Sequence, residues 1–324
     1  MPAKLSRPAL VLILLGLLAL VSIVCFMTLG AKGSWSFVLS FRGKKLASLL
    51  LVAYAVAVST VLFQTVTNNR ILTPSIMGFD ALYVLIKTGV VFFLGVGALT
   101  AIDPQMQFGL EVLVMVAFSA LLFRWLFLGE ERSLHLLVLV GIVCGVFFRS
   151  LSGFMQRMLD PNAFQVLQDS FFASFSSIDS TLLGASWLIV GVASLALWRM
   201  GHCFDVLALG RAMAVGLGVD YRSAVLKILV IVSVLVAVST ALVGPITFFG
   251  LLVASLAHGL MGGLARSSRH RHVLPAAVLL AVICLVGGQT LLERVFAFDT
   301  ALSIIVEFLG GIAFIVMVVR GAAR

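Results

Sequence analysis

Residues 9–29 read ALVLILLGLLALVSIVCFMTL, a run of 21 residues that contains no charged side chain. A helix needs roughly 20 mostly apolar residues to cross the hydrocarbon core of a bilayer. Lys4 and Arg7 precede the run, as basic residues precede the core of a signal peptide. The run is longer than a typical signal-peptide core, and further apolar runs follow it. The stretch therefore predicts a first transmembrane helix that stays in the mature protein.

The composition of the whole chain agrees with a membrane protein. Of its 324 residues, 62% are apolar and only 11% are charged, and the mean hydropathy is +1.20. Soluble domains carry about a quarter charged residues. Transmembrane β-barrels alternate apolar and polar residues, whereas the apolar runs here are continuous. The fold class we expect is an all-α polytopic membrane protein.

Ten apolar runs divide the chain, and turn signals such as Asp103–Pro104, Asp160–Pro161 and Gly244–Pro245 separate them. The gap at 153–181 leaves no room for a soluble domain and predicts a short surface helix and a loop. We expect residues 1–324 to form a single transmembrane domain of about ten helices. The runs cover residues 9–29, 46–66, 80–99, 108–128, 134–152, 182–199, 223–243, 248–265, 273–292 and 302–320.

The placement of basic residues predicts the orientation. With the N-terminus in the cytoplasm, fourteen Lys and Arg residues fall in cytoplasmic segments and seven fall outside. Because cytoplasmic loops are enriched in Lys and Arg, both termini are predicted to be cytoplasmic in a bacterial inner membrane. The outside segment Arg42-Gly43-Lys44-Lys45 runs against this bias. From the residues alone, it is either a tolerated loop or a docking site for an acidic partner.

Ionisable residues inside apolar runs are costly in lipid and are candidates for function. Lys87 and Glu307 lie deepest, whereas Asp80, Glu111 and Arg149 lie nearer the ends of their runs. Such residues could form the ion path of a secondary transporter. They form no repeated acidic array, and residues near a run's end can extend to the membrane surface, so interfacial or structural roles are favoured.

Several chemical functions are not supported. No HExxH, GxSxG or P-loop motif is present, and the four cysteines show no CxxC spacing. The net charge of +9 comes from short segments between apolar runs, which favours anionic membrane lipid over nucleic acid as a partner. We therefore expect no catalytic residue, no metal and no cofactor, and any ATP hydrolysis would require a separate subunit.

The polar stretch from Leu209 to Arg222 lies between the sixth and seventh runs. Its glycine pattern predicts a short helix that ends at Gly218. A helix lying flat at the cytoplasmic face could offer an apolar knob to a partner. An ordinary connecting loop is an equally good interpretation of these residues taken alone.

Three motifs, in order along the chain, resemble those of the FecCD family, the iron–siderophore and cobalamin permeases of ABC importers. The residues at 69–83 and 288–294 are most similar to permeases for catecholate-type siderophores. Ala254-Ser255 stands where the family often has Pro-His, so no role of that histidine carries over. The motifs are Gln64-Thr-Val-Thr-Asn68 with Pro74 and Gly78, Gly244-Pro-Ile-Thr-Phe-Phe-Gly-Leu251, and an LGxxxAxxLGV pattern at Leu209, Gly210, Ala214, Leu217, Gly218 and Val219.

The resemblance implies a type II ABC importer permease fold and a set of partners. Two permeases, identical or paralogous, would form a dimer around the path for ferric siderophores. Cytoplasmic ATP-binding subunits would grip the segment from Leu209 to Val219. A periplasmic siderophore-binding protein would dock on Arg42, Lys45 and Arg294. The alternative function is an ion-coupled secondary transporter that uses Lys87, Glu307 or Asp80.

Overall fold

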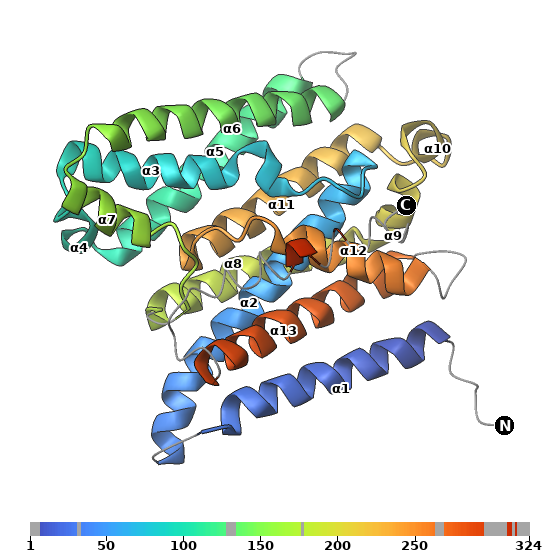
Figure 1. Ribbon diagram of the computed structural model, residues 1–324. Coiled ribbons are helices and arrows are strands. Elements are labelled where there is room, and N and C mark those ends of the chain that lie inside the picture. The colour runs from blue at the N-terminus through green and yellow to red at the C-terminus, as the bar shows by residue number, and fades with distance from the viewer. Residues whose placement is uncertain are drawn as a thin grey trace.

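A computed structural model describes residues 7–30, 34–127, 134–175, 178–262, 269–294, 310–312 and 315, and over these ranges the regular structure is entirely helical (Figure 1). The elements are α1 (Arg7–Thr28), α2 (Trp35–Thr67), the 3-10 helix η1 (Pro74–Met77), α3 (Phe79–Leu94), α4 (Ala98–Ala101), α5 (Pro104–Phe127), α6 (Leu134–Arg157), α7 (Pro161–Asp169), α8 (Ser180–Arg199), α9 (Gly201–Leu207), α10 (Arg211–Gly216), α11 (Tyr221–Val243), α12 (Phe249–Gly262) and α13 (His270–Arg294).

Nine of the ten predicted spans coincide with helices. Among the described residues, seven helices are long and apolar enough to cross a membrane, namely α1, α2, α5, α6, α8, α11 and α13. Helix α12 is apolar but shorter, and α3 has 16 residues. The predicted span at 302–320, which includes Glu307, lies outside the described residues apart from 310–312 and 315. The surface helix expected in the gap at 153–181 is α7.

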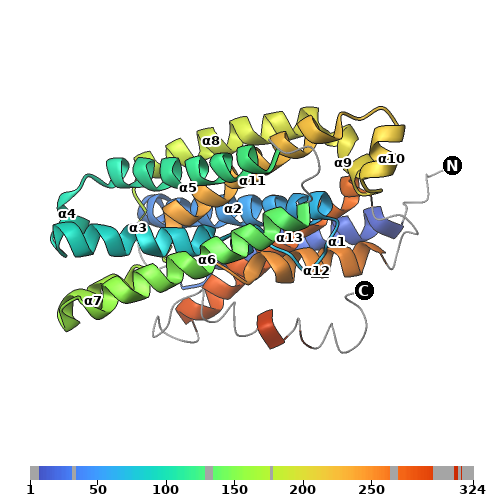
Figure 2. The ribbon, with the colours of Figure 1, turned by 90° about the horizontal axis from the view of Figure 1, so that it is seen from above.

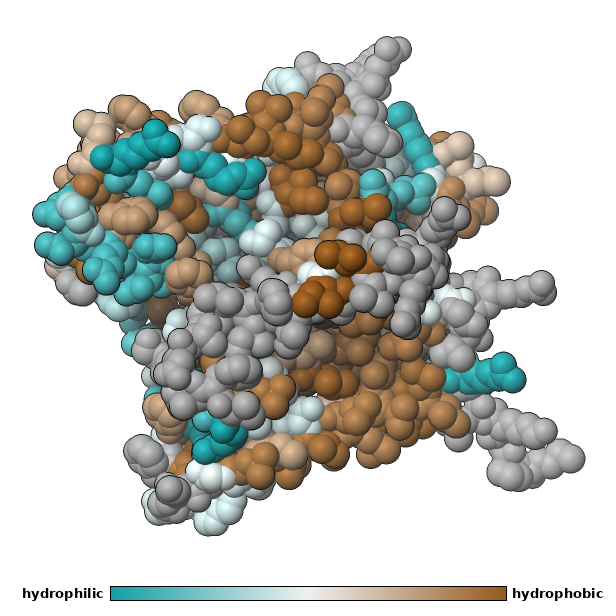
Figure 3. All heavy atoms as spheres, in the orientation of Figure 1, coloured by the Kyte–Doolittle hydropathy of each residue, from teal (hydrophilic) through white to brown (hydrophobic). Residues whose placement is uncertain are grey.

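Helix α2 forms the centre of the bundle. Helices α11 and α13 pack against it along much of its length, and α1 lies on the outer side of α13 (Figures 1 and 2). Within the apolar part of α2, 72% of the residues are buried, compared with 17% in α1. Apolar residues form a broad surface over α1 and α13, while hydrophilic residues gather at the end formed by α4 and α7 (Figure 3). This distribution is expected of a bundle surrounded by lipid.

One close helix contact depends on two glycines of α6, Gly141 and Gly145, which stand four residues apart. A Cβ added at Gly141 would lie 2.9 Å from the Cα of Met77, and one at Gly145 would lie 3.1 Å from the Cα of Gly78. Small residues at this spacing let α6 approach η1 and the start of α3 closely.

One boundary prediction was wrong. Helix α2 begins at Trp35, whereas the apolar run begins at residue 46. Arg42, Lys44 and Lys45 therefore lie on a helix and not in a loop. Arg294 likewise is the last residue of α13. Hydropathy detects the part of a helix that lies in hydrocarbon, and it cannot detect polar turns that continue beyond it.

Candidate docking and coupling sites

The predicted site residues form two groups at opposite ends of the bundle. Arg42, Lys45 and Arg294 lie where α1 ends, α2 begins and α13 ends, which is the side of α4 and α7. The segment from Leu209 to Val219 lies at the other end, around α10 (Figure 2). The two groups of candidate residues therefore lie at the two opposite ends of the bundle.

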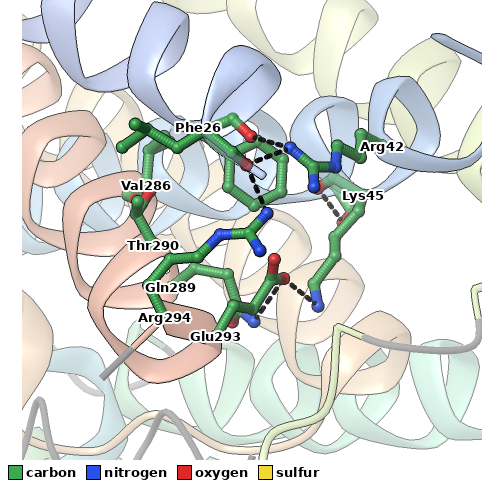
Figure 4. A network of polar contacts seen from close by, with 10 residues as sticks. Phe26, Arg42, Lys45, Val286, Gln289, Thr290, Glu293 and Arg294 are labelled. Carbon is green, nitrogen blue, oxygen red and sulfur yellow. Dashed lines mark hydrogen bonds and ion pairs between the residues drawn. The ribbon is translucent and has the colours of Figure 1, made fainter. Parts of the chain in front are cut away.

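Arg42 holds the carbonyl end of α1. Its guanidinium Nη1 donates hydrogen bonds to the carbonyl oxygens of Phe26 and Leu29, both at 2.9 Å, and its Nη2 donates to that of Gly30 at 3.1 Å (Figure 4). The last carbonyls of a helix have no partner within the helix and carry the negative end of its dipole. A guanidinium from α2 therefore caps α1 with both hydrogen bonds and charge.

Arg294 reaches the same carbonyls from α13. Its Nη2 also donates to the carbonyl oxygen of Leu29. Gly30 has a φ of +55°, and a Cβ at this position would overlap the Arg294 guanidinium. The glycine thus allows the chain to turn after α1 while the guanidinium lies against it. Two arginines from helices far apart in sequence converge on one helix end.

Lys45 forms an ion pair within the chain that was not predicted from the sequence. Its Nζ lies 2.7 Å from Oε1 of Glu293, and the two side chains are 7% and 11% exposed. The Nε2 of Gln289 donates to the same carboxylate oxygen at 3.1 Å (Figure 4). The only signal in the sequence was that Glu293 adjoins Arg294. The structure brings the three predicted residues together, but it buries Lys45, whereas Lys44 and Arg294 are exposed.

The segment from Leu209 to Val219 forms the predicted short helix, and Gly218 ends it as predicted. The Gly218 N–H donates to the carbonyl of Val215, and the Val219 N–H donates to that of Ala214, both at 3.0 Å. This pair of bonds is a Schellman motif, which requires the left-handed backbone that Gly218 adopts at a φ of +82°. At the other end Gly210, at a φ of +89°, precedes the first turn.

The short helix has an apolar outer surface. Leu209, Met213 and Leu217 are 60%, 64% and 63% exposed, whereas Ala214 is completely buried. Helix α10 packs on α9 and α11, so Ala214 anchors it while the larger side chains extend outward. We call Leu209, Met213 and Leu217 the coupling knob. Apolar side chains exposed together at the end of a membrane bundle are typical of a protein contact.

Two of the charged residues within the spans, Lys87 and Glu111, form a pair. Lys87 Nζ of α3 lies 2.7 Å from Glu111 Oε1 of α5, and the Glu111 side chain is 1% exposed. The same Nζ lies 5.4 Å from the ring centroid of Tyr83, at a distance suited to a cation–π contact. Sequence analysis placed Glu111 near the end of its run and did not pair it, because the two residues lie on different helices.

Two of the motif segments meet at a small cavity of about 20 Å³. Thr73, Asp80 and Gly244 line it, together with Thr60 of α2 and Thr240 of α11. A cavity of this size accommodates about one water molecule. The first and second motifs therefore build the packing around α2, and this cavity is far too small for a siderophore.

Comparison with known proteins identifies the family. The sequence profile described as the FecCD transport family matches residues 9–320. The chain belongs to this family. The resemblance inferred from the three motifs is thereby confirmed.

Relatives within the FecCD family include permeases of siderophore importers. The petrobactin import system permease protein YclO of Bacillus subtilis is 46% identical over 288 residues, which cover 89% of this chain and 90% of YclO. The petrobactin import system permease protein FatC of Bacillus anthracis is 35% identical over 314 residues, which cover 96% of this chain and 88% of FatC.

A solved structure has the same fold. A metal-chelate type ABC transporter in an inward-facing conformation superposes with a TM-score of 0.83, at 20% identity, over 96% of this chain and 99% of that chain. The fold class predicted from the sequence, an all-α polytopic permease of the ABC importer type, is confirmed.

Proposed function

We propose that the chain is the membrane-spanning subunit of an ATP-driven importer that carries a ferric siderophore of the petrobactin type into the cytoplasm. The observation that carries the proposal is the 46% identity to a petrobactin import permease over 89% of the chain. The exposed coupling knob supports an ATP-driven mechanism, because an ion-coupled transporter has no need of such a contact. The finer expectation of a catecholate-type siderophore stays a prediction.

The proposed partners follow from the two sites. A cytoplasmic ATP-binding subunit would receive the coupling knob and would supply all ATP hydrolysis. A periplasmic siderophore-binding protein would dock at the opposite end, on the surface around Arg42 and Arg294. A second permease, identical or paralogous, would complete the path by forming a dimer. This arrangement assigns no catalytic residue to the chain itself.

Uptake of radioactive iron tests the proposed function. Cells lacking the gene, with and without a plasmid copy, would receive ⁵⁵Fe bound to petrobactin or to a hydroxamate siderophore. We expect the plasmid to restore petrobactin-dependent uptake that stops when ATP is depleted and continues when a protonophore collapses the ion gradients. Uptake that continues when ATP is depleted and stops when the protonophore is added would instead establish the ion-coupled alternative.

The bias in Lys and Arg placement predicts that both termini are cytoplasmic. A reporter enzyme that is active only in the periplasm, fused after Arg324, is expected to give no signal. The same reporter inserted after Ile102, between α4 and α5, is expected to be active, since this position lies at the opposite end of the bundle from α10. Activity of the first fusion and silence of the second would reverse the proposed orientation.

The docking proposal predicts a salt-dependent loss of affinity for the binding protein. Replacing the exposed Arg294 by Glu, with Arg42 kept because it caps α1, is expected to weaken association up to about fivefold at low salt, because an exposed ion pair contributes about 0.2–1 kcal/mol. The deficit is expected to shrink in about 0.5 M salt, where charges are screened within a few ångströms. Surface plasmon resonance on the reconstituted permease measures both values.

Lys45 is left unchanged in this experiment, because a glutamate there would face Glu293 and would disturb the fold. The matched control is Arg157→Glu, which reverses an exposed charge at the end of α6, on the same side of the bundle. If the control and the test variant lose equal affinity for the binding protein, the overall electrostatic field of this face attracts the binding protein and no particular residue does. Wild-type affinity of the test variant at every salt concentration would refute the docking assignment.

A further inference from the structure

His270, the first residue of α13, joins three elements near the coupling knob. Its Nδ1 lies 2.7 Å from Oδ1 of Asp205 in α9, and its Nε2 lies 2.6 Å from the hydroxyl oxygen of Thr65 in α2. Its backbone N–H also donates to Oδ1 of Asp205, at 2.8 Å. The His270 side chain is buried, at 7% exposure. All the polar atoms of this histidine's ring are therefore engaged by other helices.

The contact with Asp205 places a proton on Nδ1 of His270. A carboxylate only accepts hydrogen bonds, so the Nδ1 that lies 2.7 Å from Asp205 donates. The Thr65 hydroxyl lies within hydrogen-bond distance of both Nε2 and the Val61 carbonyl oxygen. His270 therefore holds Asp205 through two donors, its ring Nδ1 and its backbone N–H.

The surroundings of Asp205 favour its carboxylate form. Partial burial alone would raise the pKa of Asp205, but hydrogen bonds from the backbone and ring of His270, together with its charge and that of Arg269, outweigh it and lower the pKa. The carboxylate also faces the N-terminus of α13, where the helix dipole favours a negative charge. The ring of Phe204 lies edge-on to His270 with centroids 5.9 Å apart and covers it on the α9 side.

The cluster of Thr65, Asp205 and His270 lies close to the coupling knob. Helix α9 ends at Leu207 and α10 begins at Arg211, so only three residues separate Asp205's helix from the knob's helix, and the two helices pack together. On its other side the cluster holds α2, the central helix of the bundle, and α13, which packs along it. A continuous set of contacts therefore runs from α10 through Asp205 and His270 to α2 and α13.

We propose that His270 is a positioning residue for transport, which ties α9 to α2 and α13 so that movements of the ATP-binding subunit reach the central helices. This inference rests on the proposed function, since it assigns a role within ATP-driven import. Replacing either His270 or Asp205 removes the contact between the ring and the carboxylate that joins α9 to α13, which weakens the tie. The expected defect is uncoupling, in which ATP is hydrolysed without a matching import of siderophore.

The test uses the complete importer in proteoliposomes, with the ATP-binding subunit and the petrobactin-loaded binding protein. His270→Gln and Asp205→Asn are expected to keep hydrolysis within about twofold of wild type and to reduce siderophore imported per ATP about tenfold, the factor for roughly 1.4 kcal/mol of lost coupling. The double variant is expected to be no worse than either single one, because both remove the same contact. The matched control is His202→Gln, an exposed histidine in α9, which is expected to change neither value.

Two further measurements keep the proposal testable if a variant does not assemble. Thr65→Val retains the shape of the residue and removes the hydrogen-bond partner of Nε2, so a smaller loss of coupling is expected. Solid-state ¹⁵N NMR of histidine-labelled wild-type importer is expected to show one histidine with a protonated Nδ1 in strong contact with a carboxylate. A wild-type import ratio in the assembled variants, or an Nδ1 of His270 without a proton, would overturn the inference. Absence of ATP-dependent import by the wild type would instead refute the proposed function.

Discussion

Replacing Gly218 by valine is expected to abolish siderophore import while the permease stays in the membrane at its normal amount. Gly218 has a φ of +82° and ends α10 with two hydrogen bonds. The left-handed conformation costs a residue with a side chain about 1–2 kcal/mol, and a β-branched residue more. Valine would therefore favour a different backbone there, which would redirect Leu217 and distort the coupling knob.

The expected loss of import depends on where the valine at position 218 distorts the protein. The knob is exposed and lies outside the core, so its distortion leaves the bundle intact. Under the proposed function, contact with the ATP-binding subunit would depend on the shape of the coupling knob, and each 1.4 kcal/mol lost there is about tenfold in affinity. We expect import to fall at least about tenfold and the ATP-binding subunit to stop copurifying.

Gly216 provides the matched control, since it lies two residues away in the same helix. Its backbone is helical, and a Cβ there would meet no atom of the described residues within 4 Å. Gly216→Ala is therefore expected to preserve import. Membrane content of each variant is measured by immunoblot, and import by ⁵⁵Fe uptake. Normal import by the valine variant would show that the segment has no coupling role.

Replacing Lys87 by methionine is expected to destabilise the protein by about 3–5 kcal/mol, the typical cost of removing one partner of a buried ion pair. Glu111 is 1% exposed, so its carboxylate would remain in the bundle without the ammonium group that lies 2.7 Å away in the wild type. Thermal unfolding in detergent, followed by circular dichroism, measures the loss. Lys227→Met, the same change at an exposed position of α11, is expected to leave stability unchanged.

The double variant Lys87→Met, Glu111→Leu separates a structural role from ion coupling. An apolar pair of similar volume often replaces a buried ion pair at little or no cost. We therefore expect the double variant to regain most of the stability and to import siderophore normally. If Lys87 carried a coupling ion, the double variant would be stable and inactive, and that result would favour the secondary-transporter alternative.

The features that could be predicted from the sequence are those that local chemistry determines. Gly218 was identified because a left-handed helix end requires glycine at that position. The partners of the charged residues could not be predicted in the same way. Lys45 pairs with Glu293, 248 residues along the chain, and His270 pairs with Asp205, 65 residues away. Such pairs depend on which helices become neighbours, and hydropathy carries no information about that.

The contacts that hold α1 have a consequence for the order in which the helices assemble during translation. Helix α1 leaves the ribosome long before α13, yet it packs chiefly on α13, and Arg294 at the end of α13 helps to hold its last carbonyls. At 5–20 residues per second, synthesis of the roughly 240 residues between the two helices takes about 10–50 s. Arg42 of α2 can cap α1 soon after both helices are made, but the surface of α13 on which α1 packs does not yet exist. During that interval α1 is held in the bilayer by its own hydrophobicity and one arginine, so this part of the bundle assembles only after α13 has been synthesised.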